Sequence, residues 1–201
     1  AEIKNVGLLN CNVNNTGTGR VPHIGALAAR TEAGTIENCF STGIVNGSTY
    51  VGGLIGATHQ TTTKNCYSEC NVTGIVEAVG GLIGNPDGAS NHVVNCFASG
   101  TVKGNKDVGG LLGSISSHVE NCYATGAVSG NESVGGLVGL GWSSYAIINS
   151  HSTGSVNGKL YTGGLVGWRG NARITSNCYA SGNVTGEKYT GSVLTPICPM
   201  G

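Results

Sequence analysis

Charge is scarce in this chain. Only 10% of its 201 residues are Asp, Glu, Lys or Arg, and ten acidic residues balance ten basic ones, whereas about a quarter of residues are charged in a typical globular domain. A chain without an excess of either sign presents no electrostatic surface to nucleic acid or to an anionic membrane. We therefore expect no nucleic-acid partner.

Long apolar runs are missing as well. None approaches the roughly 20 residues that a transmembrane helix needs, so we expect no insertion into a membrane. We find no signal-peptide pattern, and the sequence begins at "AEIKN" without methionine. That beginning is compatible with a processed, exported protein and equally with an arbitrary boundary.

Glycine and cysteine are abundant instead. The chain has 36 glycines and eight cysteines, while glycine makes up about 7% of typical proteins. No Cys-x-x-Cys pair occurs, and Cys and His do not alternate at zinc-finger spacing, so we expect no metal site. A high cysteine content in a charge-poor chain favours an exported protein, and we expect an extracellular or cell-surface location.

Most of the cysteines and glycines belong to an internal repeat. A copy begins with Asn-Cys and an aromatic residue, or a variant of that pattern, and contains a string such as "VGGLIG". A degenerate copy, "IKNVGLLNCNVNNTGTGRVPHIGALA", comes first, so about seven copies fill the chain. The successive repeat asparagines are 27, 30, 26, 28 and 28 residues apart. They are Asn38, Asn65, Asn95, Asn121, Asn149 and Asn177.

The repeat predicts an all-β solenoid. Short alternating stretches such as "YATGAVSGN", with glycine every few residues, are typical of short strands joined by tight turns. A period of 26–30 residues suits one coil of a stacked solenoid, while a propeller or a sandwich is the weaker alternative. We expect one domain over 1–201 without a capping helix: a degenerate coil at 1–35, regular coils at 36–176, and a partial coil with a tail at 177–201.

The repeat also resembles a known family. Asn-Cys-(Phe/Tyr)-(Ser/Ala)-(Thr/Ser)-Gly followed by Val-Gly-Gly-Leu-(Ile/Val/Leu)-Gly is similar to the GLUG repeat, and the resemblance covers essentially the whole chain. It implies a scaffold of exported bacterial or archaeal surface proteins, among them adhesins and the non-catalytic regions of IgA-specific metallopeptidases. The zinc motif His-Glu-x-x-His of those peptidases is absent from this sequence, so the resemblance does not carry over their activity.

Stacked coils place equivalent residues about 4.8 Å apart. The repeat asparagines then form a column that can hydrogen-bond amide to amide, as in cross-β assemblies; the alternative is that each asparagine serves only its own turn. The next residue of each copy forms a second column. Its members are Cys39, Cys66, Cys96, Cys122, Ser150 and Cys178.

Two states of the cysteine column fit the sequence. In the first, the thiols stay reduced and face the core as small apolar side chains. In the second, neighbours are bonded as Cys39–Cys66 and Cys96–Cys122, because the coil spacing lies within the Cα window for disulfides of about 4.4–6.8 Å, and Cys178 meets Cys198 in the tail. Cys11 and Cys70 are a full coil apart, which makes them candidates for bonds to a second molecule.

The string "VGGLIG" is apolar at successive positions rather than at alternate ones. A strand with one wet face should alternate, and a strand that is apolar throughout is usually covered on both faces. Its Gly-Gly pair lets the chain turn sharply or lets two backbones approach closely. We expect an inserted loop, a second sheet or another molecule to cover the outward face, and we favour another copy of this chain.

Catalytic residues are not evident. The ten acidic residues include only two aspartates and fall at non-equivalent places in the repeat, and the five histidines fall singly. No nucleophile elbow or phosphate-binding loop is present, so we expect no enzyme and no cofactor. An aromatic column favours packing over a sugar-binding platform. It consists of Phe40, Tyr67, Phe97, Tyr123, His151 and Tyr179.

Two functions fit these features. Open strand edges, low charge and apolar walls are what soluble monomers avoid. They favour a structural protein that assembles with copies of itself, by stacking of coil edges and by lateral packing, into a cell-surface fibre, tube or sheath. The alternative is an adhesin or spacer module of a larger surface protein that binds a host surface or a glycan. Asn-x-Ser/Thr sequons, some of which chance would supply, are candidate glycosylation sites. They lie at Asn14, Asn46, Asn71, Asn131 and Asn183.

Overall fold

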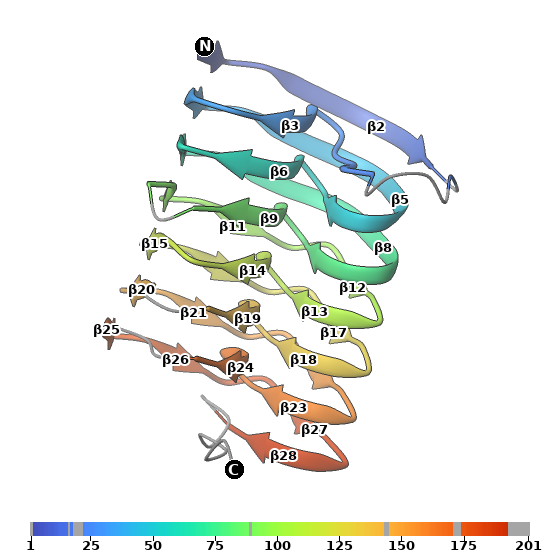
Figure 1. Ribbon diagram of the computed structural model, residues 1–201, viewed down its shortest axis with the longest axis vertical. Coiled ribbons are helices and arrows are strands. Elements are labelled where there is room, and N and C mark those ends of the chain that lie inside the picture. The colour runs from blue at the N-terminus through green and yellow to red at the C-terminus, as the bar shows by residue number, and fades with distance from the viewer. Residues whose placement is uncertain are drawn as a thin grey trace.

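The chain folds into a stack of β-coils, as predicted from the repeat (Figure 1). In the computed structural model, the described residues are 2–15, 17, 22–88, 90–142, 145–170 and 174–192. They form 28 strands and no helix, so none of them lies in a helix that could cross a membrane. The strands make about six turns of a solenoid whose axis is vertical in Figure 1.

Three parallel sheets run along the solenoid, and each coil contributes to all three in turn. Sheet A contains β1 (Glu2–Lys4), β4 (Gly34–Glu37), β7 (Thr61–Lys64), β10 (His92–Val94), β15 (His118–Glu120), β20 (Ala146–Ile148) and β25 (Ile174–Ser176). Sheet C contains β3 (Ala28–Thr31), β6 (Ile55–His59), β9 (Ile83–Asp87), β14 (Leu112–Ile115), β19 (Val138–Gly141) and β24 (Val166–Arg169).

Sheet B is the longest path of the coil and is built from one long strand or several short strands per coil. Its long strands are β2 (Gly7–Asn14), β5 (Phe40–Gly52) and β8 (Tyr67–Gly80). Its short strands are β11 (Phe97–Ala98), β12 (Val102–Lys103), β13 (Lys106–Gly109), β16 (Tyr123–Ala124), β17 (Val128–Ser129), β18 (Glu132–Gly135), β21 (His151–Ser152), β22 (Val156–Asn157), β23 (Leu160–Gly163), β26 (Tyr179–Ala180), β27 (Val184–Thr185) and β28 (Lys188–Gly191).

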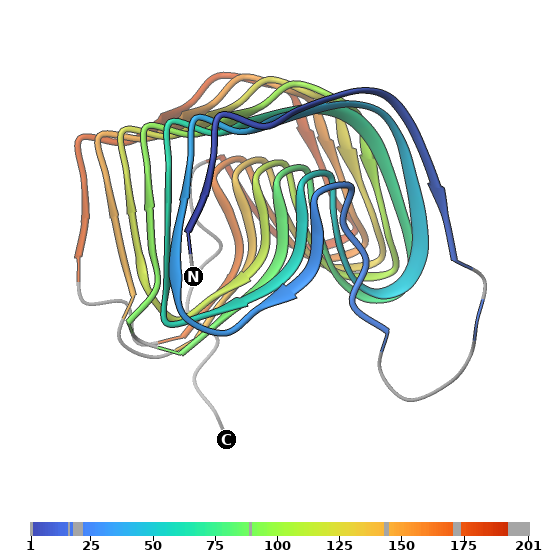
Figure 2. The same cartoon turned by 90° about the horizontal axis from the view of Figure 1, so that it is seen from above.

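The coil is not a simple oval in cross-section. Figure 2 shows that sheet B runs along one wall, curves round, and then turns back into the interior before the chain leaves again along sheet C. The second glycine of each Gly-Gly pair lies at the innermost point of this return. We call the column of these residues the glycine waist; it consists of Gly53, Gly81, Gly110, Gly136 and Gly164.

The glycine waist touches the opposite wall, where the repeat carries only serine or alanine. A Cβ on Gly110 would lie 2.8 Å from the Cβ of Ala124 and 2.1 Å from the carbonyl oxygen of Gly136. Ser41 Oγ donates a hydrogen bond of 2.9 Å to the Gly53 carbonyl at the same place in its coil. Glycine is therefore required here by close approach of two walls.

This contact divides the interior into two cores. The first contains the buried leucines, isoleucines and column cysteines, between sheets A, B and C. The second is built mainly of valines, such as Val45, Val72 and Val108, inside the curve of sheet B. A "VGGL" string thus sends its valine into one core and its leucine into the other.

The second face of the "VGGLIG" strand is covered by the chain itself, so the expectation that a neighbouring molecule covers it is wrong. The return of the coil brings the outer face of sheet C against the end of sheet B. A Cβ on Gly84 would lie 2.6 Å from the carbonyl carbon of Tyr50 and 2.7 Å from Val51 N. Leu82 and Ile83 have no exposed surface in the single chain.

The coils at the two ends are less buried than those between them. Sheet A has seven strands and sheet C has six, so the described residues form six complete coils and an incomplete seventh. The second coil begins with β4 at Gly34 and the incomplete coil with β25 at Ile174. Leu54 and Val156 are at most 1% exposed, whereas their counterparts in the terminal coils are half-buried.

Candidate functional site

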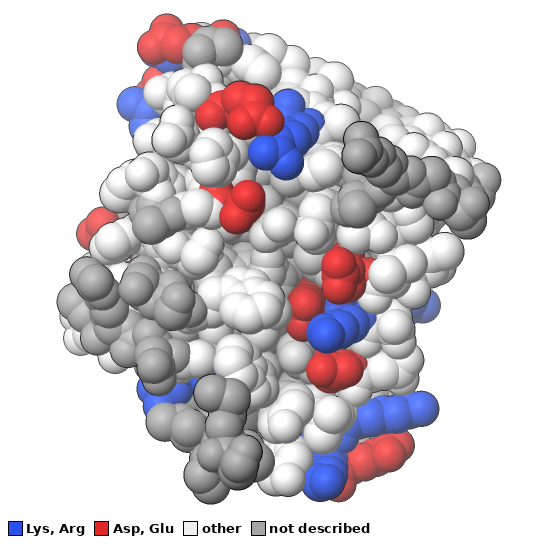
Figure 3. Space-filling view, in the orientation of Figure 1, with Lys and Arg blue, Asp and Glu red and all other residues white. Residues whose placement is uncertain are grey.

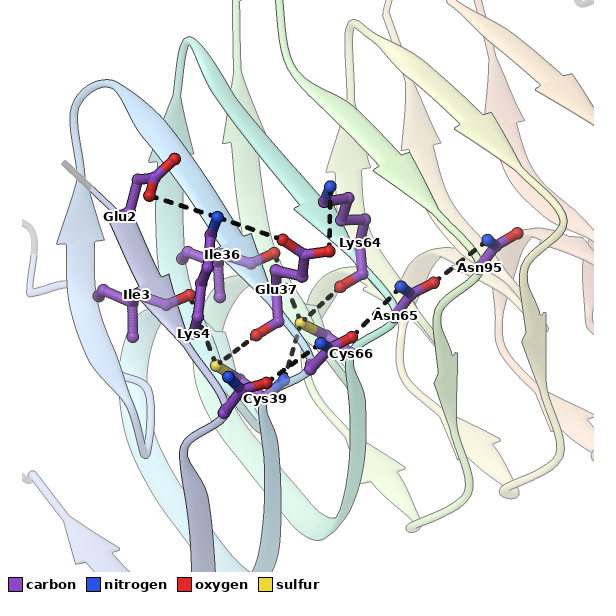
Figure 4. Close-up of polar contacts among 12 residues, drawn as sticks. Glu2, Ile3, Lys4, Ile36, Glu37, Cys39, Lys64, Asn65, Cys66 and Asn95 are labelled. Atoms are coloured by element: carbon purple, nitrogen blue, oxygen red, sulfur yellow. Dashed lines mark hydrogen bonds and ion pairs between the residues drawn. The ribbon is translucent and has the colours of Figure 1, made fainter.

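The structure brings the six repeat asparagines together in one column at the corner between sheets A and B. Each side-chain amide donates to the amide oxygen of the preceding coil, for example Asn65 Nδ2 to Asn38 Oδ1 and Asn95 Nδ2 to Asn65 Oδ1, both at 3.2 Å (Figure 4). Asn5 adds a seventh member, because its Oδ1 accepts from Asn38 Nδ2 at 3.1 Å.

Backbone conformation is a second reason for asparagine at this corner. All seven residues have a positive φ, for example 54° at Asn38 and 53° at Asn121. Asparagine is among the few side chains that tolerate this left-handed region. The corner therefore selects asparagine twice, once for its backbone and once for its amide.

The described cysteines are all free thiols, so the pairing Cys39–Cys66 and Cys96–Cys122 is not formed. Instead the thiols bond the backbone of the corner. Cys66 Sγ accepts from Cys39 N at 3.4 Å and donates to the Lys64 carbonyl at 3.2 Å (Figure 4). This is the reduced arrangement, and Cys178 lies in the same column.

Ser150 shows which hydrogen bonds the side chains of this column must make. Its hydroxyl accepts from Cys122 N at 3.1 Å and donates to the Ile148 carbonyl at 2.7 Å. A serine thus makes the same two bonds as a cysteine, which shows that the position needs a small side chain that both donates and accepts. Burial raises the pKa of the Cys39 and Cys178 thiols and keeps them protonated, as donation requires.

The other cysteines lie elsewhere. Cys11 and Cys70 occupy one column with Gly43 between them, so a full coil separates the two thiols. Cys11 is half-buried, but Cys70 has no exposed surface, which leaves it without access to a second molecule. The predicted partner of Cys178, Cys198, lies outside the described residues.

The aromatic column is a stack of rings on the outer face of sheet B. Phe40, Tyr67 and Phe97 stack at centroid distances of 4.9 and 4.8 Å with interplanar angles of 3° and 1°. The stack continues through Tyr123 and His151 to Tyr179. Because the rings cover one another's faces, only their edges are available to solvent between the ends, which fits packing rather than a sugar platform.

The sequon asparagines do not form one site. Asn14 and Asn46 are neighbours on β2 and β5. Asn131 donates to Asn105 Oδ1 at 2.8 Å, and Asn71 Oδ1 accepts from the Thr101 backbone at 3.0 Å. Asn183 directly precedes β27. Glycosylation of any of the five sequon asparagines stays a prediction.

Several charged and imidazole side chains share columns, which corrects the expectation that they fall at non-equivalent places. Glu37 lies between Lys4 and Lys64, with Nζ–Oε distances of 3.5 and 3.0 Å (Figure 4). His92 and His118 pair in register, and their rings stack at 5.4 Å.

A second charged column borders a groove between the end of sheet B and sheet C. Lys106 pairs in register with Glu77 on one side and with Glu132 on the other. Figure 3 shows acidic and basic side chains gathered over the region of β13 and β18. The groove encloses about 390 Å³. It is lined by Glu77, Lys106, Asp107, Glu132, Ser133, Leu140, Trp142, Tyr161 and Trp168.

Asp107 is the most unusual residue of this groove. It is 6% exposed and has a φ of 54°, and its Oδ1 has no hydrogen-bond partner among the described residues. Burial raises the pKa of this carboxyl to about 6, against the lowering effects of Lys106 and of a hydrogen bond from Ser133. A buried acceptor without a donor is costly, and Asp107 is the one acidic residue among the described residues with such an atom.

An alignment of the repeat on its asparagines hides the charged column of the groove. Glu77 lies one residue farther from its asparagine than Lys106 and Glu132 lie from theirs. Counted back from the valine of "VGG", all three stand at the same distance. Within the described part of the chain, no three His, Cys, Asp or Glu side chains converge to hold a metal ion.

Comparison with known proteins identifies the repeat. The GLUG motif matches residues 104–129, which run from the turn before β13 to the end of β17. No curated protein and no solved structure matches the chain. The matched segment pairs in register with the coils on both sides of it. The chain is therefore a β-solenoid repeat protein that contains a GLUG motif.

Proposed function

We propose that this chain is a non-enzymatic structural protein of the cell surface, which assembles by stacking the end coil of one copy on the end coil of another. The resulting fibre, tube or sheath would be held by the same backbone ladders that join the coils within one chain. The carrying observation is that core side chains of the two end coils, such as Leu27 and Val184, are only partly buried, whereas their counterparts in the coils between are buried.

The N-terminal coil shows this partial burial most clearly. Leu27 donates its backbone N–H to the Leu54 carbonyl at 2.8 Å and so begins the leucine column. Leu54 is fully buried, but Leu27 is only partly buried. A cavity of about 260 Å³, lined in part by Ile3, Ala28 and Ile36, opens at this end. A further coil would cover these apolar side chains.

The last described coil also has core side chains that are incompletely buried. Cys178 and Ala180 pack against the first core, and Val184 packs against the second, but all three are only partly buried. Exposed strand edges with open cores favour strand-to-strand association. We do not propose lateral packing of molecules through the "VGGLIG" wall, because that wall is covered within the chain.

The test is assembly of the purified chain, followed by electron microscopy and sedimentation. We expect filaments or end-to-end oligomers. Leu27→Glu places a charge in the open core and should abolish assembly. Leu9→Glu is the matched control, because Leu9 is 70% exposed and outside both cores, and this variant should assemble normally.

Circular dichroism would establish that both variants keep the β-fold. A wild-type chain that stays monomeric at all concentrations, or a folded Leu27→Glu variant that assembles like the wild type, would contradict the proposal. The first of these results would support the second candidate function, a spacer or adhesin module of a larger surface protein. The groove that contains Trp142 and Trp168 favours that candidate.

A further inference from the structure

The groove contains residues that stacking of the coils does not require. Trp168 occupies a register position that holds Ala57, Asn85, Ser114 and Leu140 in other coils. Small and polar side chains therefore satisfy the fold at this position. The only other tryptophan of the chain, Trp142, lies in the same groove and is 55% exposed. Both indoles thus lie in one groove, and the fold does not require a tryptophan at the Trp168 position.

Asp107 is equally unnecessary for the fold. Its counterparts in the neighbouring coils are Ala78 and Ser133, and all three have a φ close to 54°. The backbone therefore accepts a neutral residue here, yet the chain buries a carboxylate whose Oδ1 lacks a donor among the described residues. Oδ1 itself is almost fully covered, so a ligand would contact Asp107 through the part of the residue that lines the groove.

The charged column at the rim adds both donors and acceptors. Lys106 Nζ lies 3.8 Å from Glu132 Oε1, and Glu77 is its register neighbour on the other side. All three line the groove together with Asp107. A ligand bound here would meet carboxylates and an ammonium group within one coil spacing of each other.

We infer that this groove binds carbohydrate, with a sugar ring packed on the tryptophans and its hydroxyls bonded to Asp107 and the charged column. Sugars combine an apolar C–H face with hydroxyls that donate and accept, which matches aromatic rings beside polar groups. The volume of about 390 Å³ lies within the usual range of ligand sites. The inference does not depend on coil stacking between molecules.

A cationic ligand fits the groove less well. Aromatic cages for quaternary ammonium groups surround the cation with ring faces. Here the two indoles meet edge to face, at 66° and 6.5 Å, so their faces do not surround a common centre, although Glu77, Asp107 and Glu132 outnumber Lys106 in the lining. A neutral, hydroxylated ligand can use both the lysine and the carboxylates.

Tryptophan fluorescence provides a direct test, because both tryptophans of the chain line the groove. Cellohexaose, chitohexaose and mannohexaose would each be titrated into the whole chain, with choline chloride as the cationic comparison. We expect a saturable change in emission with at least one oligosaccharide and none with choline. No saturable change with any of the three sugars at millimolar concentration, or a response to choline alone, would overturn the inference.

Three variants locate the binding to the groove. Trp142→Ala and Asp107→Asn should each weaken the affinity for the responding sugar roughly tenfold. Tyr179→Ala is the matched control, because Tyr179 is 53% exposed but lies on the outer aromatic column, and its affinity should be unchanged. Equal affinity in all three variants would place the sugar elsewhere and refute the assignment. Thermal melts would confirm that each variant is folded. The affinity of the Trp142→Ala variant is measured by the fluorescence of Trp168 or by calorimetry.

Discussion

The corner between sheets A and B and the groove between sheets B and C differ in how strictly the repeat is kept. At the corner, every described coil has an asparagine with the same positive φ and the same amide bond. In the groove, one register position holds Tyr50, Ala78, Asp107, Ser133 and Tyr161 in successive coils. Identity along a column therefore marks what stacking needs, and variation marks where a coil can acquire a property of its own.

The largest effect should follow from filling the glycine waist, which both regions depend on. In Gly110→Ala the new Cβ would meet the Gly136 carbonyl oxygen at 2.1 Å, and backbone cannot move away cheaply. We expect a loss of about 3 kcal/mol or more in the free energy of unfolding, measured with urea. Gly170→Ala is the control, because its nearest neighbour would be 3.1 Å away; equal losses in the two variants would argue against the waist.

Removing the buried charge of the groove should increase the free energy of unfolding at neutral pH, whereas filling the glycine waist lowers it. Asp107 has a pKa of about 6 in the folded chain against a reference value of 3.8, so the folded state binds more protons than the unfolded state between these values. Stability should therefore fall as the pH rises from 4 to 6. Asp107→Asn should lack this fall and be more stable at pH 7 by up to about 3 kcal/mol.

Charged neighbours must be considered in that measurement. Lys106 lowers the pKa of Asp107, while Glu77 and Glu132 raise it. Glu132→Gln should thus lower the pKa of Asp107 and reduce the pH dependence without removing it. An Asp107→Asn variant with the same pH profile as the wild type would show that another group is responsible.

The asparagine column should give a smaller loss. Asn121→Ala removes two amide bonds, to Asn95 and Asn149, and places a less tolerant residue at a φ of 53°. We expect destabilisation of about 2 kcal/mol. Asn121→Gly keeps the backbone freedom and loses only the bonds, so it should be less damaging; if both variants cost the same, the left-handed backbone is not part of the selection.

Substitutions in the cysteine column should change the free energy of unfolding least. Cys122→Ser reproduces the chemistry of Ser150 and should change the free energy of unfolding by less than about 1 kcal/mol, whereas Cys122→Ala leaves Cys96 N without its acceptor and should cost about 1–3 kcal/mol. Mass spectrometry after alkylation without reductant, in denaturant, should label the described cysteines as free thiols. Bonded pairs in that spectrum would overturn the reduced arrangement.

The sequence predicts the corner far better than the groove, for a physical reason. Because the coils stack in register, a residue type that recurs at one position of every repeat forms a column. The asparagines from Asn38 to Asn177 are an example. The state of the cysteine column was left open by the sequence, and only the hydrogen bonds of Ser150 in the structure show what that position requires. The Gly-Gly pair indicated a turn or a close approach of backbones, but only the folded coil shows that the opposing residue is a serine or an alanine.

The groove depends on contacts that no single column encodes. Asp107 and Trp168 come together because the coil turns back on itself and brings sheet B against sheet C across different coils. The extra residue between Asn65 and Val79 also hides the equivalence of Glu77 with Lys106. Sequence periodicity fixes neighbours along the axis, but the path within a coil decides which columns face each other.

The parallel ladders also have a mechanical consequence. All three sheets direct their inter-strand hydrogen bonds along the solenoid axis, as do the amide bonds of the asparagine column. A tensile force along the axis therefore loads every bond between two coils at the same time, and separation requires them to break together. A force that pulls one end of the chain sideways would instead peel a coil off bond by bond, so the rod should be strong in tension and weak against unwinding.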